Sequence, residues 1–253
     1  MEMATGHDDR RWLSRRSLLA ALSLGGPLLA SGCTKPAHSY NYRLTLSIDA
    51  NGSTHTGSSV VHVRRWMQQT IDEGWTMPTS INGEATAVEL GDGRVVVALL
   101  TSNGTRNRWG GSPTGVLLKG YGLPDPWQPS PEDGRALSGA RGAVELSADQ
   151  LPELVGFKRY VDPQSALLLD PSNMSALGAD VRLHGAQIEV TDSPVSSGIV
   201  RILPWLQAKL WAESQAGQYT WGLTTHPAWM LVLPTGRAPG QFVWPSQFKQ
   251  TAW

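Results

Sequence analysis

A single cysteine carries the clearest chemistry in this sequence. Cys33 follows three small residues at 30–32, and these end a run from position 17 that carries no charged side chain. The pattern is typical of a bacterial lipobox, in which the nucleophilic thiol takes a diacylglyceryl group and a peptidase cleaves the bond before the cysteine. We therefore expect Cys33 to be lipidated and to become the mature N-terminus. The alternative is a soluble exported protein in which this cysteine is incidental.

The residues before Cys33 have the features of an export signal. Arg15 and Arg16 precede the apolar run, and their surroundings are similar to the twin-arginine motif, although paired arginines also occur in general secretory signals. The run is shorter than the roughly 20 apolar residues of a spanning helix, so residues 1–32 are predicted to be a signal peptide and residues 33–39 a tether. Thr34 stands where an aspartate would retain a lipoprotein at the inner membrane. This favours a periplasm-facing location at the outer membrane.

The rest of the chain has no constellation that names a reaction. The six histidines are scattered, and no pair has the spacing of a zinc motif. No glycine-rich phosphate loop is present, and the 21 basic and 21 acidic residues balance, which gives no support for nucleic-acid binding. We therefore expect no metal, no cofactor and no nucleic-acid partner, and a role without catalysis is favoured.

One candidate binding group lies in a Pro- and Gly-rich excursion at about 103–133. Trp109, Asp125 and Trp127 place an acid near aromatic rings, a combination that could bind or cleave sugars. The alternative is that these Trp residues pack in the core.

A second candidate group lies beside predicted turns. Asp192, Arg201 and Trp205 flank a segment rich in Ser, Pro and Gly, and loops held by a rigid sheet often carry function. The alternative is again structural, with Pro194 and Gly198 shaping a corner and Trp205 filling the core.

Alternating hydrophobicity predicts the strands that must position these groups. Residues 40–48 carry apolar side chains at every second position, and Asn51-Gly52 is a strong two-residue turn signal before a returning strand at 57–66. The β-prone runs 84–90 and 94–100 flank an Asp-Gly turn and predict a second hairpin. Four further strands are predicted, at 116–119, 154–158, 181–190 (as a central strand) and 229–233.

Helices are expected to be few and short. One is predicted after Asp170-Pro171 and one from Pro204, while the tail from 236 to 253 is expected to be irregular. The whole pattern predicts a mainly β fold, with antiparallel sheets or a sandwich and one or two short helices, in a single domain over residues 40–253. A β-rich α+β fold is the alternative.

Four stretches are distinctive when taken together: 56–61, 83–94, 162–171 and 188–206. In this combination the chain resembles an uncharacterised family of proteobacterial exported proteins with a twin-arginine-like lipoprotein signal. The resemblance covers most of the predicted mature chain and implies one β-rich domain. The family has no assigned activity, so the resemblance implies no catalytic residues.

These observations favour a lipid-anchored periplasmic protein that acts by binding or by supporting an envelope assembly. Its partners would be the membrane, through the N-terminal lipid, and an envelope protein or glycan. The alternative is an exported enzyme or glycan-binding protein that uses the Trp and acidic residues of the 103–133 excursion.

Overall fold

The structure is a computed structural model of the 253-residue chain. It describes residues 35–70, 74–76, 78–100, 113–123, 136–137, 139–216, 231–233, 241–243 and 245–250. The predictions for the signal peptide at 1–32, for Cys33, and for Trp109, Asp125 and Trp127 concern positions outside these ranges.

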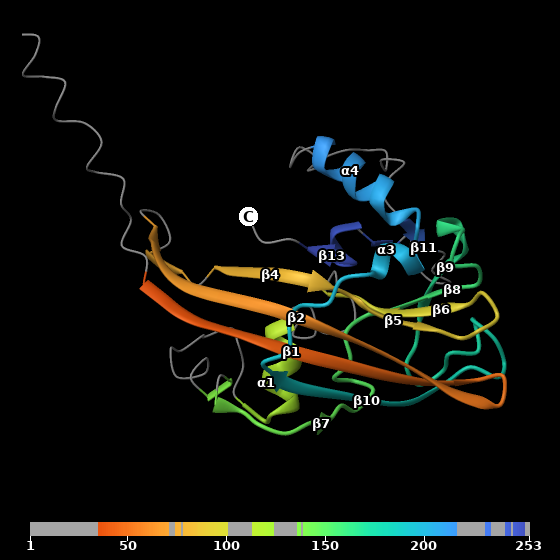
Figure 1. Cartoon of the computed structure of the whole chain (residues 1–253), viewed down its shortest axis with the longest axis horizontal. Helices are drawn as coiled ribbons and strands as arrows, with labels where there is room; N and C mark the ends of the chain where they lie inside the picture. The colour runs from red at the N-terminus through yellow and green to blue at the C-terminus, as the bar shows by residue number, and fades with distance from the viewer. Residues whose placement is uncertain are drawn as a thin grey trace, which may run out of the picture.

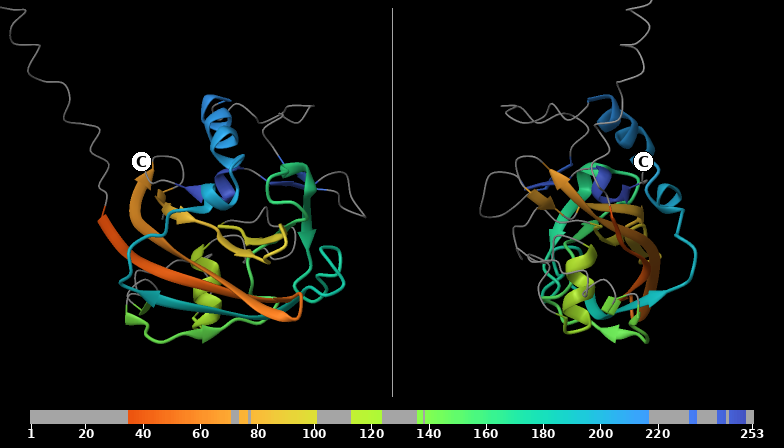
Figure 2. Two further views of the ribbon diagram at one scale, coloured as in Figure 1. Left: turned by 45° about the vertical axis from the view of Figure 1, so that its right-hand side comes forward. Right: turned by 90° about the vertical axis from the view of Figure 1, so that its left-hand side faces the viewer.

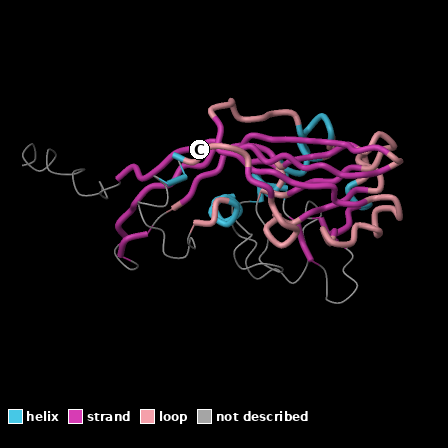
Figure 3. Tube along the Cα trace, turned by 90° about the horizontal axis from the view of Figure 1, so that it is seen from below, coloured by secondary structure: helices cyan, strands magenta, loops and turns pink. Residues whose placement is uncertain are grey.

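A long hairpin dominates the architecture and runs along most of the molecule (Figures 1 and 3). It consists of β1 (Lys35–Ala50) and β2 (Ser53–Thr70), joined by Asn51 and Gly52. These two residues have φ angles of 54° and 74°, the positive values that a type I′ turn requires. The predicted alternation along β1 is confirmed, because the apolar side chains of residues 40–48 are all buried: Tyr40, Tyr42, Leu44, Leu46 and Ile48.

Both strands of the hairpin are longer than predicted. β1 begins at Lys35, so residues 35–39 belong to the sheet and the prediction that they form part of a tether is wrong. β2 begins at Ser53, directly after the turn, rather than at 57. The residues at 53–56 are polar and mostly exposed, so their hydrophobicity gave no signal. Pairing with β1, propagated from the tight turn, keeps them extended.

The hairpin is the centre of a larger antiparallel sheet with the strand order β13-β4-β2-β1-β10-β7, to which β3 adds by pairing with β2. The added strands are β3 (Gly74–Thr76), β4 (Thr79–Glu84), β7 (Val144–Glu145), β10 (Arg182–Thr191) and β13 (Lys249–Gln250). The strand predicted at 181–190 is confirmed as β10. It lies between β1 and the short edge strand β7, so it is next to the edge rather than central.

A second, four-stranded sheet has the order β5-β6-β8-β9. Its strands are β5 (Thr86–Glu89), β6 (Val95–Ala98), β8 (Leu154–Phe157) and β9 (Ala166–Leu169). The predicted hairpin at 84–100 and the strand at 154–158 are thereby confirmed. Every residue of β6 and β8 is buried, as expected for the two interior strands. A short 3-10 turn, η1 (Pro163–Ser165), capped by Asp162, leads into β9.

The chain passes from one sheet to the other at Ala85. β4 ends just before this residue and β5 begins just after it, so one extended segment contributes to both sheets. Their buried side chains form one hydrophobic core. Near this junction β2 approaches β5 so closely that a Cβ atom on Gly57 would lie 2.0 Å from the carbonyl oxygen of Ala87. The prediction of a mainly β fold with antiparallel sheets is confirmed.

Two of the local predictions are wrong. The strand expected at 116–119 is part of a helix, α1 (Pro113–Gly120), because three consecutive buried apolar residues suit either conformation and Pro at the first position favours a helix. The helix expected after Asp170-Pro171 is a series of turns. Here the Asp170 carboxylate accepts hydrogen bonds from the N–H and hydroxyl of Ser172, at 3.0 and 2.6 Å, and closes a tight turn.

The C-terminal part is more ordered than predicted. The helix expected from Pro204 is confirmed as α4 (Leu206–Ala216), which lies on the outside of the sheets (Figures 1 and 2) and is preceded by the unpredicted α3 (Ile199–Ile202). None of the helices in the described ranges is long and apolar enough to cross a membrane.

The strand predicted at 229–233 is confirmed as β11 (Leu231–Leu233), paired with β12 (Gln241–Val243). The prediction of an irregular tail is wrong over the described positions of this region, which contain β12, the 3-10 turn η2 (Pro245–Gln247) and β13. Phe248 is fully buried, so this segment is part of the core.

The crossing of β2 and β5 provides a stability test. We expect Gly57→Ala to lower the free energy of unfolding by about 3 kcal/mol, because the added methyl group overlaps a backbone oxygen that cannot move alone. Gly185→Ala in β10 is a matched control, since its Cβ would have no neighbour closer than 4.0 Å. Urea unfolding of both variants would measure the difference, and equal losses would contradict the close approach.

Candidate functional site

A cleft of about 430 Å³ lies where the two sheets separate. Its walls come from three parts of the chain: the edge of β2, the β4–β5 junction, and the segment that leads into α3. Its polar lining residues are Ser58, Ser59, Glu84, Glu89, Ser196, Ser197 and Arg201. Because these residues are distant in sequence, only the fold brings them together.

The segment that follows β10 forms one wall by crossing the outer face of the hairpin. Asn41 Nδ2 donates a hydrogen bond of 2.8 Å to the carbonyl oxygen of Ser193, and Arg43 donates one of 2.6 Å to its hydroxyl. Ser196 then reaches the edge of β2, where its N–H donates to Val60 O at 3.0 Å and its hydroxyl accepts from Val60 N at 2.8 Å. These bonds hold the wall in place across β1 and β2.

A buried carboxylate joins the elements around the cleft. Glu84 is only 4% exposed, and its Oε2 accepts a hydrogen bond of 2.7 Å from the N–H of Ile199 in α3. The ammonium of Lys249 in β13 lies 2.8 Å from Oε1, outside hydrogen-bonding geometry, so this contact is an ion pair. Glu84 therefore has a structural role, because both of its oxygens are committed to protein partners.

Two charges in the cleft have no partner among the described residues. Arg201 and Glu89 are both exposed, and neither side chain makes a hydrogen bond or ion pair with that part of the chain. A Cβ on Gly198, which has φ 141°, would lie 2.9 Å from Arg201 Nη2, so the guanidinium folds back over this glycine. The cleft thus offers one cation, one anion and the exposed hydroxyls of Ser58 and Ser197.

The chemistry of this lining suits binding. The described residues of the cleft include no histidine and no cysteine, and none of its serine hydroxyls is hydrogen-bonded to a basic side chain that could activate it. Throughout the described ranges, no group of three or more His, Cys, Asp or Glu side chains could hold a metal ion. A guanidinium and a carboxylate in an open cleft can instead orient a polar ligand.

The structure separates the second predicted group. Arg201 lines the cleft, whereas Asp192 is exposed outside it. Trp205 packs against Phe157 and Phe248, with ring centroids 5.5 and 5.7 Å away, and its Nε1 donates to Tyr160 O at 2.8 Å. This Trp therefore has the core-packing role that was the alternative to binding.

Sequence reasoning missed the residues that line the cleft together with Arg201. Glu89 is the last residue of a predicted strand, and Ser58 lies inside another, so neither position carried a signal of its own. The first predicted group, Trp109, Asp125 and Trp127, lies outside the described residues.

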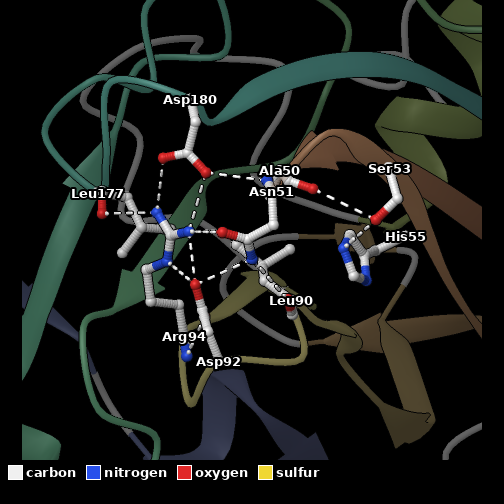
Figure 4. A network of polar contacts seen from close by, with 9 residues as sticks. All are labelled: Ala50, Asn51, Ser53, His55, Leu90, Asp92, Arg94, Leu177 and Asp180. Carbon is white, nitrogen blue, oxygen red and sulfur yellow. Dashed lines mark hydrogen bonds and ion pairs between the residues drawn. The ribbon is translucent and has the colours of Figure 1, made fainter.

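A second polar cluster ties three turns together (Figure 4). Arg94 donates two hydrogen bonds of 3.0 Å to the carboxylate of Asp180, one of 2.7 Å to Asp92 and one of 3.1 Å to the side-chain oxygen of Asn51. Asn51 in turn donates its backbone N–H to Asp180 at 2.9 Å and its amide to Leu90 O at 3.1 Å. We call this set the Arg94 clamp, and its mutual pairing gives it a structural role.

The charged groups of the Arg94 clamp stabilise one another in their ionised forms. Hydrogen bonds from the Arg94 side chain hold the pKa of Asp92 well below its usual range, and those from Arg94 and from the backbone N–H of Asn51 do the same for the pKa of Asp180. The two carboxylates raise the pKa of Arg94. All three groups are therefore charged over the physiological range.

Comparisons of this chain with models of protein families, with curated proteins and with solved structures found no match.

The ion pair at Glu84 gives the first prediction for this region. We expect Lys249→Met to lower the free energy of unfolding by about 1–3 kcal/mol, because it leaves a buried carboxylate without its cation. Lys158→Met, at an exposed position directly after β8, is the control and should change stability by less than about 0.5 kcal/mol. Chemical unfolding measures both, and a loss no greater than that of the control would contradict the structural role of Glu84.

The Arg94 clamp predicts a pH dependence. Because the folded pKa values of Asp92 and Asp180 are depressed, their contribution is complete above the unfolded pKa near 3.8 and is lost as pH falls below it. We expect Arg94→Gln to be less stable than the wild type at pH 7, because the charged hydrogen bonds of Arg94 are lost, and to approach the wild type in stability between pH 4 and pH 2.

Thermal unfolding across this pH range is the measurement. Arg159→Gln is the control, because Arg159 pairs with Asp162 at a largely exposed site. A constant difference between wild type and Arg94→Gln at all pH values would contradict the clamp.

Proposed function

We propose that this chain is a lipid-anchored protein of the bacterial envelope that faces the periplasm and acts by binding a ligand in the cleft. The observation that carries the binding role is the presence of Arg201 and Glu89, opposite charges without described partners, in a cleft of about 430 Å³. The anchor is supported by Cys33 within its lipobox-like sequence, and Thr34 favours the outer membrane.

The position of the anchor fits this role. Cys33 precedes the first residue of β1, Lys35, by two positions, so a lipid on its thiol would be attached within about 7 Å of the sheet. The cleft lies further along the hairpin, where Ser58 pairs with Thr45. At the usual rise of a strand this pair is roughly 34 Å from Lys35. The cleft of an anchored protein can therefore lie up to about this distance from the membrane surface.

The described cleft supports a ligand class other than stacked sugars. Sugar sites commonly use aromatic platforms, and none of the described lining residues is aromatic. The alternative of an exported glycan-binding protein or glycosidase depends on Trp109, Asp125 and Trp127, which lie outside the described residues.

The anchor is tested by intact mass and cell fractionation of the expressed protein. We expect a membrane-bound species that starts at Cys33 and carries added lipid mass. In Cys33→Ala this species should be lost. Arg15→Lys with Arg16→Lys distinguishes the export routes: unprocessed protein in the cytoplasm is expected for the twin-arginine route, and unchanged processing for the general secretory route. A soluble wild-type product cleaved at another position would contradict the proposed anchoring.

A further inference from the structure

The tight turn of the hairpin determines which backbone groups of β2 point away from β1. After a two-residue turn the closing pair, Ala50 and Ser53, is hydrogen-bonded, and bonded pairs then alternate along the strands. The N–H and C=O groups of even-numbered residues in β2 therefore face its outer edge. Two known partners agree with this alternation: β4 pairs with β2 over residues 62–65, and Ser196 bonds both backbone groups of Val60.

The next outward-facing residue along this edge is Ser58, and it lies in the cleft. It is exposed, and its outward N–H and C=O have no hydrogen-bond partner in the described part of the chain. The edge is open here because β4 leaves it: Gly83 adopts φ 154°, and Ala85 takes the chain into the second sheet. The cleft therefore continues the path that β4 follows along β2.

The unpaired charges of the cleft lie in the same cavity as this open edge. Arg201 and Glu89 line the same cleft as Ser58, whereas the charge of Glu84 is already matched by Lys249. Outward backbone donors and acceptors are complementary to an extended peptide, which pairs with a sheet edge through its main chain and is selected through its side chains. A single unpaired cation and a single unpaired anion match a peptide with side chains of both signs.

We propose that the cleft binds an extended peptide as an added β-strand beside β2, with main-chain hydrogen bonds to Ser58 and an acidic side chain paired with Arg201. A basic side chain of the peptide pairs with Glu89. This inference rests on the proposed binding function and names its ligand class. Ser196 is a precedent within the chain itself, because it hydrogen-bonds both outward backbone groups of Val60 on the same edge of β2.

The experiment selects random heptapeptides from a display library against the purified chain, and then measures the affinity of the enriched peptides as synthetic compounds. We expect the enriched sequences to share an acidic residue. Ser58→Pro removes the outward N–H and no bond of the β1–β2 ladder, so binding should weaken about tenfold or more. Ser58→Ala keeps the N–H and should bind like the wild type.

The charge is tested in the same way. Arg201→Gln should weaken binding by about tenfold or more, while the control Arg159→Gln, at an exposed arginine that is not among the lining residues of the cleft, should have no effect. Methylating the peptide amide nitrogens one at a time leaves the protein unchanged. Binding should be abolished only in the peptide whose methylated amide is the one that pairs with Ser58. This arm remains informative if Ser58→Pro does not fold.

The proposal is overturned if no peptide is enriched more strongly on the wild-type protein than on the Arg201→Gln protein. It is equally overturned if the enriched peptides bind Ser58→Pro as tightly as Ser58→Ala while N-methylation has no effect. Failure of the membrane anchor would be seen separately in the intact mass and fractionation of the wild type. If the protein is soluble but still binds acidic peptides at Ser58 and Arg201, the peptide-binding inference stands and the proposed anchoring is contradicted.

Discussion

The two-residue turn at Asn51 and Gly52 is the constraint on which the rest of the structure depends. Its positive φ angles permit a hairpin with no extra residue, and this fixes one register over nearly the whole length of β1 and β2. The register places the apolar side chains of β1 on the core face. It also determines which backbone groups bond β10, β4 and Ser196. The Arg94 clamp, which includes Asn51, holds this turn against the second sheet.

The core and the cleft arise from the same departure of the chain. When β4 turns away at Gly83 and Ala85, it delivers β5 to the second sheet and closes the core between them. The same departure leaves the β2 edge without its neighbour at Ser58. The close approach of Gly57 to Ala87 shows how tightly the two sheets meet beside this opening. The cleft is therefore a consequence of how one extended segment contributes to two sheets.

Much of the fold could be predicted from sequence, because alternation reports burial directly. The first hairpin and the 84–100 hairpin have strong local signals in their turns, and both are present. Predictions failed where tertiary contacts decide, as in α1, whose short apolar run suits helix or strand, and at β13, which is extended only because it pairs with β4. For the site, only Arg201 was found in advance. Glu89 and Ser58 have ordinary strand surroundings, and their proximity depends on long-range packing.

The ion pair between Glu84 and Lys249 has a consequence for the order in which the protein is assembled. β4 is synthesised long before β13. The Glu84 carboxylate and the edge of β4 are therefore exposed for a time without β13, the strand that pairs with this edge. Contacts between distant segments form late, because the intervening chain must first be ordered. The ion pair is thus among the last contacts to form. During synthesis, the nascent chain exposes an unpaired strand edge that favours association with chaperones or with other extended chains.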